Sequence, residues 1–180
     1  MSASVIYPNQ RSQVRYSVWQ PWEINALATC TAGIKTGDQG IYSQGWQLLT
    51  QLQQLRALGG LVRACGDLVR QCFELGALVQ DDADISVHTV EQMVAQAPPG
   101  MGPSPEALMD MIALVADVSS PEFWSPVLLD PLRYLALLLG TYTCIASWLA
   151  GKAGMSLDSF VHQHLAAMQA PELVHENIDI

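Results

Sequence analysis

Hydrophobic side chains between Ile41 and Val79 recur at the spacing of a long amphipathic helix. They form adjoining rows seven positions apart: Leu48, Leu55, Val62 and Val69; Leu61, Leu68 and Leu75; and Leu58, Cys65 and Cys72. A stripe this broad is typical of a helix in a bundle, because a two-stranded coiled coil shows a narrower seam. The pair Gly59-Gly60 lies inside the stretch and predicts a kink there, or a division into two helices.

Shorter helices are predicted on both sides of this stretch. The first covers Pro21 to Thr36, since proline suits a first helical turn. Others are expected after three serines that can cap a helix N-terminus, which are Ser86, Ser104 and Ser156. The segment 97–105 is rich in proline and glycine but too short to separate domains. Residues 23–171 are therefore predicted to form a single-domain, all-α helical bundle of six or seven helices.

The segment from Tyr134 to Gly151 holds 18 residues without a charge, between Arg133 and Lys152. Its length reaches the lower bound for a membrane-spanning helix, which needs about 20 residues. Its threonines and Gly140, with helical segments on either side, favour instead the central buried helix of a bundle. We therefore expect no membrane partner, and a span over this segment is the minor alternative.

Residues 1–22 differ from the rest of the chain because they are β-prone and rich in aromatic side chains. The turn signal Pro8-Asn9 separates two extended segments, 4–7 and 13–19, so we expect an extended or hairpin-like N-terminal arm. Its aromatic residues, candidates for contact with a partner protein, are Tyr7, Tyr16, Trp19 and Trp22. An arm packed on its own domain is the simpler interpretation, because chain ends need anchoring. Residues 172–180 are predicted to be a polar tail.

Charge is distributed unevenly along the chain. Lys and Arg total 8 against 17 Asp and Glu, which gives a formal net charge of −9 at pH 7. Residues 1–79 carry six basic and four acidic side chains, whereas residues 80–180 carry two and thirteen. The acidic balance argues against nucleic-acid binding, which depends on clustered Lys and Arg. A chain divided in this way can attract a second copy head to tail, or hold a basic partner on one face.

The composition indicates a folded, cytoplasmic protein. A chain of 180 residues that is 50% hydrophobic can bury a core of its own. Its first residues lack the basic and apolar regions of a secretory signal. The cysteines are widely spaced, at Cys30, Cys65, Cys72 and Cys144, with no Cys-x-x-Cys pair. We therefore expect reduced, mostly buried thiols and no zinc site.

No motif for catalysis or cofactor binding is complete in the sequence. A P-loop fails around Gly33-Ile-Lys-Thr36, because Ile34 separates the glycine from the lysine. A Gly-x-Ser-x-Gly nucleophile motif is absent, so no catalytic residue is predicted. His162 and His164 stand two apart on a predicted helix and point about 200° from each other, so they cannot share a metal ion. We expect no cofactor and no metal.

The most distinctive surface feature is three arginines seven residues apart, Arg56, Arg63 and Arg70. Asp67 and Glu74 follow the last two by four residues, and this spacing predicts a ladder of intrahelical ion pairs worth ~0.3–0.5 kcal/mol each. The ladder is the more ordinary interpretation. Arginine is also enriched at protein interfaces, so the same stripe is our candidate surface for an acidic partner.

Three hypotheses of function follow. The leading one is a non-enzymatic protein that acts through protein–protein contact in assembly or regulation, as an adaptor or inhibitor, with itself as a candidate partner in a homo-oligomer. The alternative is a bundle that holds a small apolar ligand in an internal pocket lined by methionine and tryptophan. The third is a metal-dependent helical enzyme that uses the cluster Asp81, Asp82 and Asp84. Without a second acidic motif, that cluster is more simply a solvated turn.

Overall fold

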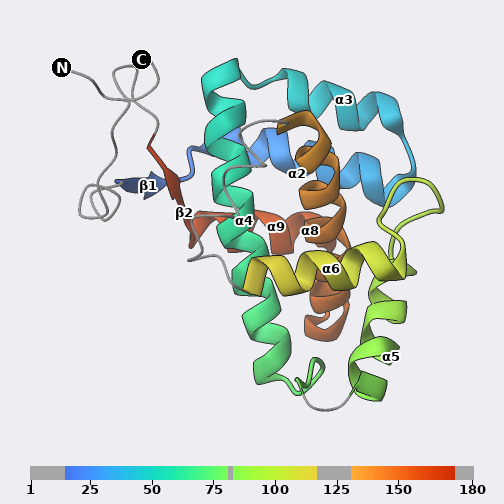
Figure 1. Ribbon diagram of the computed structural model, residues 1–180. Coiled ribbons are helices and arrows are strands. Elements are labelled where there is room, and N and C mark those ends of the chain that lie inside the picture. The colour runs from blue at the N-terminus through green and yellow to red at the C-terminus, as the bar shows by residue number, and fades with distance from the viewer. Residues whose placement is uncertain (1–14, 81–82, 117–130, 173–180) are drawn as a thin grey trace.

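The computed structural model describes residues 15–80, 83–116 and 131–172, and it confirms the all-α architecture (Figure 1). Seven helices lie in this described part, in agreement with the predicted six or seven. They are α2 (Pro21–Thr36), α3 (Gln39–Gln47), α4 (Gln51–Glu74), α5 (Ala83–Val94), α6 (Pro105–Ala116), α8 (Pro131–Ala153) and α9 (Leu157–Ala166). A two-stranded sheet of β1 (Tyr16–Val18) and β2 (Gln169–Pro171) completes the fold.

α8 is the central helix of the bundle. Every residue from Leu138 to Ala150 is buried, and the helix contacts α2, α4, α5, α6 and α9. Among the described residues, the stretch Tyr134–Ala153 is long and apolar enough to cross a membrane, yet 78% of an 18-residue segment within it is buried inside the protein. The uncharged segment therefore forms the core around which the other helices pack, as its pattern predicts.

The long helical stretch divides, but not at Gly59-Gly60, so the predicted division into two helices at that pair is wrong. Both glycines are buried inside the continuous helix α4, which begins after Thr50. Thr50 Oγ1 accepts a hydrogen bond from the Gln53 backbone N–H at 3.2 Å, and Gln53 Oε1 accepts one from the Thr50 N–H at 2.9 Å. This reciprocal cap satisfies two N–H groups that a helix start leaves free, and it separates α4 from α3.

Two of the three predicted serine caps are confirmed. Ser104 Oγ accepts from the Ala107 N–H at 3.1 Å, and Ser156 Oγ accepts from the Ser159 N–H at 3.1 Å. Ser86 is not a cap, because α5 begins three residues earlier. Its hydroxyl instead bonds both backbone polar groups of Val79, at 2.9 Å each. These two hydrogen bonds hold the loop before α5 against α5 itself.

The described part of the N-terminal arm is extended, but its strand pairs with the far end of the chain. β1 runs antiparallel to β2, with Ser17 opposite Ala170. The Glu172 N–H also donates to the Arg15 carbonyl at 2.8 Å. The predicted strand at 4–7 lies outside the described residues. The sheet therefore joins both ends of the described chain beside α4 (Figure 1).

Candidate functional site

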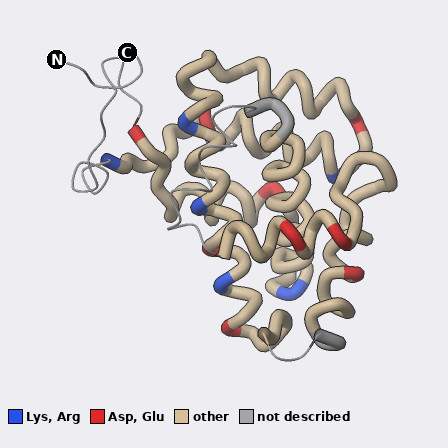
Figure 2. Tube along the Cα trace, viewed as in Figure 1, with Lys and Arg blue, Asp and Glu red and all other residues tan. Residues whose placement is uncertain are grey.

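The three arginines of the predicted stripe lie along one side of α4 but in three different environments. Figure 2 shows the basic positions of this helix following one side of the molecule, whereas α5 and α6 carry acidic positions. Arg56 is largely buried, Arg63 is half-buried, and the Arg70 side chain is 58% exposed. Equal spacing on the helix thus does not give them equal access to a partner.

Arg56 is a structural residue that fastens the sheet to the bundle. Its Nε donates to Glu23 Oε2 at 2.9 Å, and the Glu23 side chain is only 2% exposed. The other guanidinium nitrogens donate to the two strands, at Ser17 Oγ and at the carbonyls of Ser17, Val18, Ala170 and Pro171. With these partners engaged, its guanidinium faces the interior and the sheet.

Arg63 has a cationic group without a carboxylate partner within the described residues. Its guanidinium carbon lies 4.2 Å from the centroid of the Tyr16 ring, a cation–π arrangement. Its Nε is buried and has no hydrogen-bond partner in the described part of the chain. The predicted pair with Asp67 is not formed, because Asp67 turns toward Arg70 and His164. Among the described residues, the Arg63 guanidinium thus faces the Tyr16 ring and not a carboxylate.

Arg70 sits in an intrahelical ion-pair cluster of the predicted kind. Its Nη2 donates to Asp67 Oδ1 at 2.6 Å, and its Nη1 donates to Glu74 Oε1. Both carboxylates raise the pKa of Arg70 above its ordinary value, chiefly through the hydrogen bond with Asp67. With one cation and two carboxylates, the cluster carries a formal charge of −1.

The aromatic residues of the arm separate into buried and exposed groups. Trp19 is 3% exposed and packs in the core, whereas Trp22 is 55% exposed at the start of α2. Tyr16 is 39% exposed and covers Arg63. Tyr7 lies outside the described residues. The arm is thus anchored on its own domain by Trp19, and Tyr16 and Trp22 stay at the surface.

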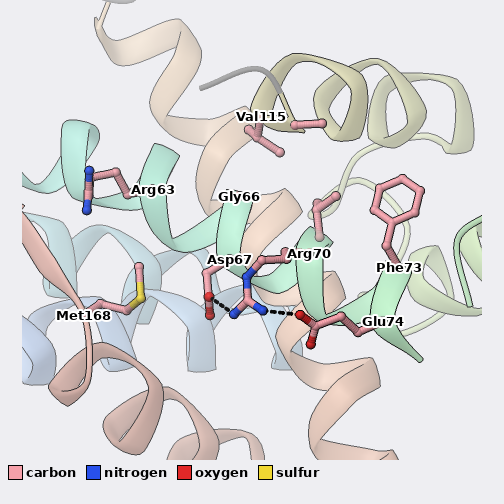
Figure 3. A pocket seen from close by; sticks show the side chains of 10 residues that line it. Arg63, Gly66, Asp67, Arg70, Phe73, Glu74, Val115 and Met168 are labelled. Carbon is pink, nitrogen blue, oxygen red and sulfur yellow. Dashed lines mark hydrogen bonds and ion pairs between the residues drawn. The ribbon is translucent and has the colours of Figure 1, made fainter. Parts of the chain in front are cut away.

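A groove of about 750 Å³ runs along α4 from Arg63 past Arg70 to Phe73 and Glu74 (Figure 3). Its floor is mainly apolar and is formed by α4, by the end of α6 and by Met168. The lining residues are Arg63, Gly66, Asp67, Val69, Arg70, Phe73, Glu74, Val115, Ala116 and Met168. Phe73 lies at one end and is 42% exposed. An open apolar floor with a charged rim suits the side of a protein helix.

Beneath the groove, a chain of hydrogen bonds links three helices. The Tyr142 hydroxyl of α8 lies 2.9 Å from Nδ1 of His164 on α9, and His164 Nε2 lies 2.8 Å from Asp67 Oδ2. With a neutral imidazole and an ionised Asp67, Nε2–H donates to Asp67 and Nδ1 accepts from the Tyr142 hydroxyl. Phe160 stacks on the imidazole, with ring centroids 5.8 Å apart. This relay is completely buried at Tyr142, whereas at its other end Asp67 lines the groove.

The relay sets the charge states of its members. Burial lowers the pKa of His164, and its hydrogen bond to Asp67 opposes that effect only in part. Burial by itself would raise the pKa of Asp67, but hydrogen bonds from Arg70, His164 and Gln71 outweigh it and lower that pKa. Burial also raises the pKa of Tyr142 well above its ordinary value. A neutral histidine beside an ionised aspartate is the arrangement these shifts favour.

All four cysteines are buried and free, as predicted. Burial raises the pKa of Cys30 and Cys72 to about 12 and that of Cys144 to about 11. It raises the pKa of Cys65 as well. Thiols held protonated in this way are poor nucleophiles and poor metal ligands.

Within the described ranges, no three His, Cys, Asp or Glu side chains come together as a metal site. Asp81 and Asp82, on which the enzyme hypothesis depends, lie outside the described residues, as does the side chain of Asp84. The candidate P-loop lysine, Lys35, has another role. Its Nζ donates to Ser147 Oγ at 2.8 Å and to Gln96 Oε1 at 3.0 Å. It thereby ties α2 to α8 and to the end of α5.

The residues of the relay were not predicted from the sequence. Asp67 and His164 are 97 residues apart, and no periodicity connects them. One signal was present, because Tyr142 lies inside the most apolar helix and a buried tyrosine hydroxyl needs a hydrogen-bond partner. Sequence alone did not identify that partner.

The comparisons with known proteins supply no relative. No family model matches the chain, and neither the curated proteins nor the solved structures contain a match. We therefore infer the function from the groove along α4 and the charged side chains beside it.

Proposed function

We propose that this protein acts through protein–protein contact, by binding a helix of a partner in the groove along α4. The observation that carries the proposal is the groove itself, in which an apolar floor is flanked by Arg63 and Arg70. An amphipathic helix would bury its apolar face on Phe73, Ala116 and Met168, which keep exposed surface in the groove, and bring a carboxylate to Arg63. This contact uses two of the three arginines predicted to face a partner.

The shape of the groove favours a protein partner over a small apolar ligand. Small ligands are held in concave pockets that bury most of their surface, with few charged groups. Here the rim carries four charged side chains, and the floor is open along the length of α4 (Figure 3). The buried methionines Met93 and Met111 belong to the packed core, whereas Met168 lines the groove.

Site-specific photocrosslinking tests this proposal. A photoreactive phenylalanine analogue replaces Phe73 at the groove, and in a control it replaces Leu48, which is 61% exposed before the start of α4. In cells that express the protein, we expect a covalent adduct with a polypeptide from Phe73 and none from Leu48. The substitution Arg63→Glu should remove most of the adduct, because it reverses the cation at the rim.

Two results would count against it. Adducts of equal yield from Phe73 and Leu48 would show non-specific contact, and no adduct from Phe73 would show that the groove is unused. The mass of the adduct distinguishes a second copy of this chain from a different polypeptide.

A further inference from the structure

We infer that the groove along α4 binds the outer face of α6 from a second copy of this chain, in a dimer with two-fold symmetry. This inference rests on the proposed function and names its partner. Three observations support it: exposed apolar side chains on α6, unpaired charges of opposite sign on α4 and α6, and the position of the groove beside α6.

The first observation is exposed apolar surface on α6. The inward face of the helix packs in the core through Leu108, Met111, Ile112 and Val115. Met109, which is 39% exposed, and Leu114, which is 45% exposed, lie about 140° apart around the helix, on the two flanks of its outward face. Glu106 and Asp110 lie between them. A partner seated on this face would cover both apolar side chains and meet both carboxylates.

The second observation is charge complementarity. Glu106 and Asp110 are exposed beside Met109 and Leu114, and the segments α5 and α6 contain no Lys or Arg (Figure 2). Neither carboxylate forms an ion pair with another described residue. The groove is lined by Asp67 and Glu74 as well as by Arg63 and Arg70, and both carboxylates pair with Arg70. Arg63 is then the lining charge without an ion pair among the described residues, and the α6 face of one copy offers a carboxylate to the Arg63 of the other.

The third observation is that the two surfaces adjoin. Val115 and Ala116, the end of α6, form one wall of the groove, as Figure 3 shows for Val115. Ala116 is exposed and follows the outward face of α6 along the chain. When a surface and its complement lie side by side on one molecule, a two-fold axis between them satisfies both at once. Each copy then gives its α6 face and receives one, so assembly stops at the dimer.

The size of these surfaces sets the expected strength. They hold about fifteen residues per copy, fewer than the ~20–30 residues a side of a standard stable interface. Association in the micromolar range follows, with weaker binding at high salt because rim charges are screened.

Analytical ultracentrifugation of the purified full chain, from about 1 to about 200 µM, tests the dimer. Two variants reverse the charges separately: Arg63→Glu, and Glu106→Lys combined with Asp110→Lys. Each should raise the dimer dissociation constant by at least about tenfold, because like charges then meet in both contacts. Glu91→Lys makes the same type of change on α5, away from the groove, and should leave the constant within about threefold of the wild-type value.

Mixing the two charge-reversed variants is the decisive step. Each cross-contact in the mixture joins opposite charges, so an equimolar mixture should recover the dimer, which a misfolded variant could not do. A wild-type chain that stays monomeric would overturn the inference. So would a dimer unaffected by both variants, a mixture that stays monomeric, or species that grow beyond the dimer. A Phe73 adduct to a different polypeptide, with a monomeric chain, would overturn this inference and leave the proposed function standing.

Discussion

Arg56 hydrogen-bonds both ends of the described chain to the bundle, whereas Arg63 faces the Tyr16 ring of β1 and Arg70 pairs within α4. Positions seven apart drift by only about 20° around a helix, so Arg56, Arg63 and Arg70 face nearly the same way. Their surroundings differ because β1 and β2 cover the stripe at Arg56 and leave it open at Arg70. The heptad spacing correctly predicts the stripe, but it contains no information on which elements from other parts of the chain cover it.

Arg56→Ala should strongly destabilise the fold. The change leaves Glu23 ionised and buried without its cation, and it leaves several strand carbonyls without a donor. Removing one partner of a buried pair costs ~3–5 kcal/mol, and we expect a loss of unfolding free energy in this range. Urea denaturation followed by circular dichroism measures it. Arg70→Ala, in an exposed cluster, is the control and should unfold near the wild-type midpoint; equal losses in both variants would contradict a structural role specific to Arg56.

At the scale of elements, α4 shows how local signals and close packing compete. The glycine pair predicts a weak point in a helix, yet the chain breaks at Thr50, where a reciprocal cap provides hydrogen bonds. Gly60 is present for another reason, because the Trp19 ring packs directly on it. A Cβ placed there would lie 2.2 Å from Trp19 Cζ2 and 2.8 Å from the Cβ of Ala170. The glycine lets the arm approach the helix backbone.

Gly60→Ala should therefore destabilise the protein, although alanine favours a helix over glycine by about 1 kcal/mol. The added methyl group must displace Trp19, and overpacking of this kind costs ~1–3 kcal/mol. Gly151→Ala is the matched control, since that glycine is in α8 with no atom within 4 Å of the added Cβ. It should stabilise by ~0.5–1 kcal/mol. Thermal unfolding distinguishes them, and a Gly60→Ala protein more stable than wild type would refute the close-packing argument.

At the scale of the whole molecule, the relay and the separation of charge connect parts that are distant in sequence. Tyr142, His164 and Asp67 bind α8, α9 and α4 together directly beneath the groove. The imidazole contacts the Asp67 carboxylate of α4, which also pairs with Arg70, and the Tyr142 hydroxyl of α8. α2 also packs on α9, and there it presents the uncharged Asn25 to His162. Protonation of His164 would therefore affect the packing of three helices.

The stability of the protein should depend on this protonation. The pKa of His164 is lower in the folded state than its ordinary value near 6.5, so the unfolded chain binds the proton more readily. The contribution of a neutral His164 to the free energy of unfolding is complete above about pH 6.5 and is lost as the pH falls through the lowered pKa. In a protonated imidazole, Nδ1 would carry a hydrogen and could no longer accept the hydrogen bond from the Tyr142 hydroxyl.

His164→Gln is the informative variant, because its amide can still accept from Tyr142 and donate to Asp67 but does not titrate. Between about pH 7.5 and about pH 5.5, the urea midpoint of the wild-type chain should decrease, and the midpoint of the variant should decrease less. Equal decreases in both proteins would assign the pH dependence to other groups.

The sequence by itself determined the class of the fold, the buried role of the apolar helix, two of the helix caps and the burial of the cysteines. These follow from local patterns, since periodicity, capping residues and turn signals act over a few residues. Only the tertiary structure decided that Arg56 faces inward, that β1 pairs with β2 and that Asp67 meets His164. Those contacts join residues about 40 to 150 positions apart, and hydrophobic patterning specifies which face is buried but not which neighbour it meets. The groove beside α6 arises in the same way, from the packing of helices that the sequence leaves separate.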